Sequence, residues 1–174
     1  MEPAELKLYE ANERERQLLL SEIGQSITSW TILESHLYRI FHHCIGIKGL
    51  NSSAAAFNAV ENFRSKLGMT DAVVRIYLGK SQLMSVWLRR EKEIVKISKA
   101  RNFIAHGSVV VLKLGRQPAK PYVLGCSPMT PNPTKNRGIA REKRLNLKDV
   151  QSITREIILL TTRLVEFCKK LPPH

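Results

Sequence analysis

The sequence predicts a mainly α-helical single domain, a helical bundle with a small β-hairpin inserted before the last helix. Three observations predict this fold. Apolar residues recur every three or four positions through most of the chain, which is the period of an amphipathic helix. Two β-branched and apolar runs, at about 108–114 and 121–126, interrupt that period once. The chain of 174 residues has the usual size of one domain with its own core.

The first part of the chain predicts two helices, one on each side of Gly24. Residues 4–23 are rich in Glu, Leu, Lys and Arg and contain no Pro or Gly, so they favour a helix. After Gly24, apolar residues with helical spacing predict a second helix: Ile27, Trp30, Leu37, Phe41 and Cys44. Glu34 falls on that apolar stripe, so we expect its carboxylate to have a partner.

Capping residues and glycines divide the middle of the chain. Residues 51–53 supply caps for a helix at 54–67, and Gly68 predicts a break before a shorter helix at 71–78. A longer helix begins after residues 79–81 and runs towards His106. We expect Gly107 to end that helix as a C-cap, because glycine adopts the positive φ that such caps use.

The last part of the chain predicts the hairpin, a basic loop and a closing helix. The two hairpin runs flank a turn-like segment at 115–120. Residues 127–145 combine prolines and Gly138 with several basic side chains and predict an extended loop. From Asn146, a capped helix with an apolar stripe runs to about Lys170, and two prolines end it.

The formal net charge of +13 is the strongest compositional feature. A charge of this size attracts polyanions, so nucleic acid is the leading class of partner. The alternative is that the charge only maintains solubility. No apolar run approaches the ~18 residues needed to span a bilayer, and the acidic N-terminus lacks the features of a secretory signal. We therefore expect a cytoplasmic protein with no membrane association.

Neither the cysteines nor the histidines predict a metal site, and we expect no cofactor. Three cysteines are far apart and lack C-x-x-C spacing, so we expect reduced thiols: Cys44, Cys126 and Cys168. His42 and His43 are adjacent, so on a helix they diverge by about 100° and do not form an i, i+4 ligand pair. His36 has no second ligand at a useful spacing.

The segment from Arg101 to His106 carries the residues best suited to catalysis. A histidine moves protons near neutral pH, and an arginine offers a fixed fork of donors to phosphate. We expect RNA cleavage in which His106 moves a proton at a ribose oxygen, Arg101 stabilises the phosphorane and Asn102 orients one of them, with no metal. Five residues of an ideal helix turn about 140°, so Arg101 and His106 share a face only if the helix unwinds near Gly107 or a second copy completes the site.

Arg101, followed by Asn102 and three residues later by His106, resembles the R-x4-6-H motif of HEPN domains. The motif lies after several predicted helices and before a final one, and this order also resembles a HEPN-like helical bundle over the whole chain, 1–174. The resemblance implies a homodimer whose motif helices face each other across a basic cleft. It also implies metal-independent endoribonuclease activity, for which we expect 2′,3′-cyclic phosphate ends. The alternative is a catalytically silent HEPN-like module that binds RNA, a nucleotide or a protein.

HEPN proteins also occur as toxins or defence components, often paired with a nucleotidyltransferase antitoxin. The resemblance therefore implies an antitoxin of that kind as a candidate partner. In some such pairs, a Tyr two residues after the motif His is modified. Ser108 stands at that position here, which puts this form of regulation in doubt.

Other residues are candidates to support the site. Glu34 can hold Arg101 through a bidentate pair, or it is a peripheral carboxylate. Basic residues of the hairpin and the following loop can track an RNA backbone by charge: Lys113, Arg116, Lys120, Arg137, Arg141, Lys143 and Arg144. The alternatives are a solvated loop, an Arg101 favoured only by the helix dipole, and a His106 that only caps or packs. A helical interaction protein that assembles through its N-terminal helix is the remaining alternative.

Overall fold

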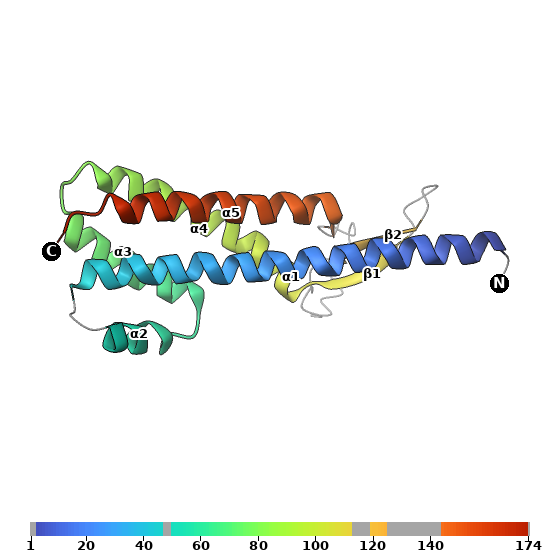
Figure 1. Cartoon of the computed structure of the whole chain (residues 1–174), viewed down its shortest axis with the longest axis horizontal. Helices are drawn as coiled ribbons and strands as arrows, with labels where there is room; N and C mark the ends of the chain where they lie inside the picture. The colour runs from blue at the N-terminus through green and yellow to red at the C-terminus, as the bar shows by residue number, and fades with distance from the viewer. Residues whose placement is uncertain (1–2, 47–49, 113–118, 125–143, 174) are drawn as a thin grey trace, which may run out of the picture. The chain divides into compact units, whose positions relative to one another are not determined.

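The computed structural model describes residues 3–46, 50–112, 119–124 and 144–173. Within these ranges the protein is mainly helical, with a three-stranded antiparallel sheet before the last helix, which confirms the predicted fold class (Figure 1). None of the described helices has an apolar stretch long enough to cross a membrane. The elements in chain order are α1 (Pro3–Ile45), α2 (Leu50–Asn58), α3 (Phe63–Leu78), α4 (Leu83–His106), β1 (Ser108–Leu112), β2 (Lys120–Leu124), β3 (Arg144–Leu145) and α5 (Leu147–Lys169).

Helix α1 is continuous through Gly24, so the prediction of two helices on either side of it was wrong. A glycine inside a helix costs only about 1 kcal/mol relative to alanine, and no proline lies near it in the sequence. Buried residues lie along α1 on both sides of Gly24, among them Leu19 and Trp30. Their packing outweighs the cost of one glycine.

The break between α2 and α3 falls earlier than predicted. Helix α3 begins after Asn62, whose extended backbone has φ −96° and ψ 141° and whose Oδ1 accepts a hydrogen bond of 2.8 Å from the Ser65 amide. The helix expected at 54–67 is therefore divided before Asn62, and Gly68 lies inside α3. A Cβ at Gly68 would meet nothing within 4 Å, so nothing in the packing requires a glycine there. Helix α3 ends at Leu78, as predicted, and Gly79, with φ 51°, is its C-cap.

The predicted hairpin is confirmed, and a third strand extends it. Strands β1 and β2 pair antiparallel, from Ser108 opposite Leu124 to Leu112 opposite Lys120. Residues 144–145, expected at the end of the basic loop, form β3 and pair with β2. Residues 127–143 of that predicted loop lie outside the described residues.

Helix α5 begins at the expected cap. The amide of Asn146 donates to Asp149 Oδ2 at 2.9 Å, and the amide of Asp149 donates to Asn146 Oδ1 at 3.1 Å. This reciprocal pair is a capping box, which satisfies two amides at the start of a helix.

The chain forms two compact units, and α1, α4 and α5 each contribute to both. Unit 1 comprises residues 1–28 and 99–155, and unit 2 comprises residues 29–98 and 156–174. The core of unit 1 joins the helices to the sheet through Leu19, Ile104, Val123, Leu145 and Val150. Unit 2 buries a helical core that includes Trp30, Leu37, Trp87, Ile94, Ile157, Leu164 and Phe167.

Candidate functional site

The candidate site lies at the C-terminal end of α4, in unit 1. Ile104 is 2% exposed and packs in the core of unit 1, with Phe103 packed against it. These two apolar residues fix the rotation of the helix about its axis. The polar residues of the predicted motif therefore have defined positions: Asn102 and His106 are exposed, and Arg101 is half-buried.

Asn102 and His106 share one face of the helix. They are four residues apart, so their side chains diverge by only about 40°. Arg101 Nη1 donates a hydrogen bond of 3.2 Å to Asn102 Oδ1, which directs the guanidinium towards that face. Because Oδ1 accepts this bond, the amide NH₂ group of Asn102 remains a donor. The cluster thus offers a cation, an amide donor and an imidazole, a set that suits a phosphate.

Helix α4 remains regular up to His106, so the unwinding considered for the motif does not occur. Arg101 and His106 consequently keep the divergence of about 140° that an ideal helix gives them. The hydrogen bond to Asn102 draws the Arg101 guanidinium towards the face that carries His106, but it does not move the His106 side chain. The regular helix therefore does not place the Arg101 and His106 side chains on one face.

Position 107 has no room for a side chain and therefore requires glycine. The prediction that Gly107 adopts a positive φ was wrong. Among the described glycines only Gly46 and Gly79 have a positive φ. A Cβ at Gly107 would lie 2.4 Å from Val123 Cγ1, 2.7 Å from the Phe103 carbonyl oxygen and 2.8 Å from that of Leu124. Strand β2 therefore approaches the junction of α4 and β1 closely, and this contact fixes the point where α4 ends.

The sheet brings one predicted RNA-binding residue close to this junction. Arg144 pairs with Leu124, which in turn pairs with Ser108, two residues after His106. Directly paired residues share a face of a sheet, so Arg144 lies about 10 Å from Ser108 on the same face. The neighbouring row faces the core through Val123 and Leu145. Arg144, which is half-buried, therefore lies on the same face of the sheet as Ser108.

Of the other predicted RNA-binding residues only Lys120 is among the described residues, and it lies farther along the sheet from His106. Lys120 is exposed and pairs with Leu112, four residues along β1 from Ser108, which corresponds to about 13 Å. Five further residues of the set lie outside the described residues: Lys113, Arg116, Arg137, Arg141 and Lys143.

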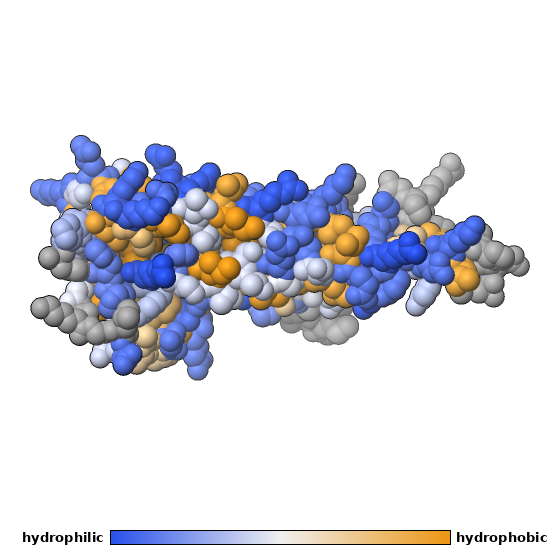
Figure 2. All heavy atoms as spheres, viewed as in Figure 1, coloured by the Kyte–Doolittle hydropathy of each residue, from blue (hydrophilic) through white to orange (hydrophobic). Residues whose placement is uncertain are grey.

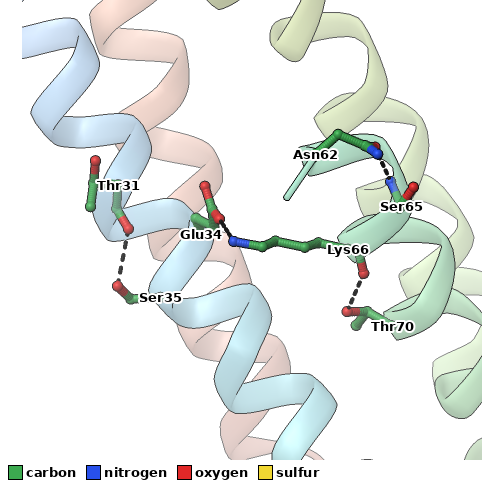
Figure 3. Close-up of polar contacts among 7 residues, drawn as sticks. All are labelled: Thr31, Glu34, Ser35, Asn62, Ser65, Lys66 and Thr70. Atoms are coloured by element: carbon green, nitrogen blue, oxygen red, sulfur yellow. Dashed lines mark hydrogen bonds and ion pairs between the residues drawn. The ribbon is translucent and has the colours of Figure 1, made fainter. Parts of the chain in front are cut away.

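Glu34 has the partner that its position on an apolar stripe predicted, and this partner is Lys66; the alternatives considered were a pair with Arg101 and a peripheral carboxylate. Lys66 Nζ reaches from α3 to Glu34 Oε1 on α1 at 2.6 Å, as Figure 3 shows. Both side chains are largely buried, with 13% exposure for Lys66 and 27% for Glu34. Lys66 Nζ also lies 5.2 Å from the centre of the Phe57 ring on α2. The pair therefore ties three helices of unit 2 together, which is a structural role.

Two of the histidines also have structural roles. His42 Nδ1 lies 2.7 Å from Ser53 Oγ, and His43 Nε2 lies 2.8 Å from the Pro172 carbonyl oxygen and 3.2 Å from the Tyr77 hydroxyl. The described residues contain no group of three or more His, Cys, Asp or Glu able to hold a metal ion.

Further basic residues, which were not predicted as site residues, are exposed on α4. Arg89, Lys92 and Lys96 lie on the solvent side of α4. Continuing the helical period backwards from His106 would have found them, because residues three or four apart share a face.

The chain has no counterpart in the comparisons with known proteins: no protein-family model, curated protein or solved structure matches it.

Proposed function

We propose that this protein is a metal-independent endoribonuclease with Arg101, Asn102 and His106 as its catalytic residues. One observation carries the proposal. Asn102 and His106 share an exposed face at the end of α4, and the Arg101 guanidinium is hydrogen-bonded to Asn102 beside them. The resemblance of this segment to the HEPN motif and the net charge of +13 support RNA as the substrate.

The proposed reaction is an intramolecular transesterification. A ribose 2′-oxygen attacks the adjacent phosphorus as it loses its proton, and the bond from phosphorus to the 5′-oxygen breaks as that oxygen gains one. The products are a 2′,3′-cyclic phosphate and a 5′-hydroxyl. His106 transfers one of these protons, while Arg101 and the Asn102 amide donate hydrogen bonds to the charged phosphorane oxygens.

We further propose that two copies of the chain complete each site. Arg101 and His106 diverge by about 140° on a regular helix, so a homodimer can place Arg101 of one copy and His106 of the other on the same phosphate. The paired α4 ends would also bring together two basic surfaces. This arrangement would concentrate positive charge where the phosphate binds.

The test is cleavage of a single-stranded RNA by the purified protein in excess EDTA, with the cyclic phosphate ends identified by mass spectrometry. We expect Arg101→Ala and His106→Ala each to lower the rate at least ~100-fold. Asn102→Ala should have a smaller effect. Arg64→Ala and His36→Ala are matched controls in unit 2 that should retain the wild-type rate.

Mixing the two inactive variants tests whether the site is shared. If Arg101 and His106 come from different copies, mixed dimers of Arg101→Ala with His106→Ala regain one intact site, and the mixture recovers about a quarter of the wild-type activity. If each site is built from one chain, mixing recovers nothing.

A silent RNA-binding module is the second candidate, and the half-burial of Arg101 together with its divergence from His106 favours it. It predicts no cleavage by the wild type and RNA affinity that survives His106→Ala. That pair of results would replace the nuclease proposal.

A further inference from the structure

Helix α4 carries a row of basic residues on the side opposite its core face. Trp87, Ile94 and Ile97 are 0%, 0% and 4% exposed and pack inside unit 2. A second set, spaced by three and four residues, lies within an arc of about 60° on the other side: Arg89, Lys92 and Lys96, all exposed. We call these three residues the α4 basic row.

The α4 basic row is not engaged in ion pairs with neighbouring carboxylates of the described chain. Within the described part of the chain, none of its three residues forms an ion pair. The nearby Glu93 carboxylate already accepts from Arg90 Nη1 at 2.6 Å and from Arg163 Nη1 at 3.5 Å. The α4 basic row is thus available to an anion from outside the molecule.

A pocket of about 250 Å³ opens beside this row between α4 and α5. Apolar and charged side chains line it: Glu93, Lys96, Ile97, Glu156, Leu159, Leu160 and Arg163. Figure 2 shows apolar side chains at the surface over α5 among hydrophilic ones. The exposed apolar residues of that helix are Ile158, at 45%, and Leu159, at 56%.

The two features fit one kind of ligand. Apolar surface next to unpaired cations suits a molecule that has a flat apolar part and an anionic part, and a nucleotide has both. The pocket has room for a group of about the size of a nucleobase and is too small for a protein helix. A base is free to enter it only when it is not stacked in a duplex, which favours a single strand.

We infer that this pocket and the α4 basic row bind single-stranded RNA, with one base against Leu159 and the phosphates along Arg89, Lys92 and Lys96. Glu156, which lines the pocket and forms no ion pair within the described residues, accepts a hydrogen bond from an N–H group of the base. The inference rests on the proposed function in that RNA is the ligand. The α4 basic row and one wall of the pocket belong to the same helix as the proposed catalytic residues. Because those residues are proposed to act on RNA, this favours RNA over an acidic protein as the ligand.

The experiment measures binding of a fluorescent 2′-O-methyl RNA strand, which cannot be cleaved by attack of a 2′-hydroxyl. Anisotropy titrations at several salt concentrations compare the wild type with the triple variant Arg89→Gln/Lys92→Gln/Lys96→Gln. The matched control is Arg64→Gln/Lys80→Gln/Lys170→Gln, which removes the same charge from exposed residues of unit 2. We expect the first triple variant to weaken binding at least ~10-fold and to reduce the salt slope by about 2. The control should change affinity far less.

The pocket is tested separately with Leu159→Asn, with Ile76→Asn as control because Ile76 is an exposed apolar residue of α3, at 84%. We expect Leu159→Asn to weaken binding several-fold without changing the salt slope, since it removes apolar contact and no charge. Equal weakening by Ile76→Asn would overturn the role of the pocket.

Three results would overturn the inference as a whole. They are unchanged RNA binding by the α4 triple variant, equal loss in the control triple, and tighter α4-dependent binding of polyglutamate than of RNA. The cleavage assay keeps the two proposals separate. Cleavage by the wild type with full binding by the α4 triple variant refutes only this inference, whereas α4-dependent binding without any cleavage refutes only the nuclease.

Discussion

Gly107 lies so close to Val123 that a β-carbon at position 107 would be 2.4 Å from Val123 Cγ1. Val123 is fully buried in the core of unit 1, so it has little freedom to move away. Two backbone oxygens, of Phe103 and Leu124, close the other sides at 2.7 and 2.8 Å. This contact joins the end of α4 to the sheet, and it therefore determines where His106 stands.

Gly107→Ala should destabilise the protein by about 1–3 kcal/mol, because the added methyl group must displace backbone or a buried side chain. Gly24→Ala is the matched control. Gly24 lies inside α1 with nothing within 4 Å of an added Cβ, so alanine there should stabilise by about 0.5–1 kcal/mol. Urea denaturation of both variants measures the two changes. A Gly107→Ala variant as stable as the wild type would show that the α4–β1 junction is not tightly packed.

Removal of the Lys66 ammonium should affect stability and leave cleavage intact. Lys66→Met leaves the Glu34 carboxylate, 27% exposed, without its partner, at a cost of about 1–2 kcal/mol. Glu34→Gln/Lys66→Met should recover part of that loss, because no unpaired charge remains. Thermal unfolding gives the stabilities, and the EDTA-resistant cleavage rate gives the function. A Glu34→Gln variant with normal stability and no cleavage would show that Glu34 acts in catalysis and not in stability.

Local signals were enough to predict several elements. The hairpin followed from two β-branched runs around a turn, and α5 followed from an Asn146 cap before an apolar stripe. Asn62 and Gly24 show the limit of such signals. Asn62 caps α3, yet Asn51 and its neighbours gave an equally good cap signal, and the cost of Gly24 was outweighed by the burial of distant residues.

The partner of Glu34 could not be predicted for a related reason. Its position on an apolar stripe correctly indicated that it needs one. The choice between Lys66 and Arg101 depends on how α1 packs against α3, which no local pattern contains. The α4 basic row, in contrast, was accessible from the sequence, because Arg89, Lys92 and Lys96 follow the same helical period as the buried Ile94 and Ile97 on the opposite face.

Ser53→Ala should loosen α2. Ser53 is fully buried, and its Oγ lies 2.7 Å from His42 Nδ1 and 3.1 Å from the Tyr38 hydroxyl, both on α1. Removing the hydroxyl deprives two half-buried polar groups of a partner, which costs about 1–3 kcal/mol. Ser52→Ala, at an exposed neighbouring position, is the control. Hydrogen exchange should accelerate in the α2 amides of the first variant only; equal exchange in both would show that Ser53 does not hold α2.

Cys44 should be protected from alkylation in the folded protein. Burial, with a smaller contribution from Cys168, raises the pKa of the Cys44 thiol from 9.0 to about 12. The folded chain keeps this proton between those two values while the unfolded chain loses it. The unfolded state then binds fewer protons, so this thiol lowers stability as the pH rises from 9 towards 12. At pH 8.5 iodoacetamide should modify Cys44 far more slowly in the native protein than in urea, as followed by peptide mass spectrometry. Equal rates would mean that Cys44 is accessible and ionises normally.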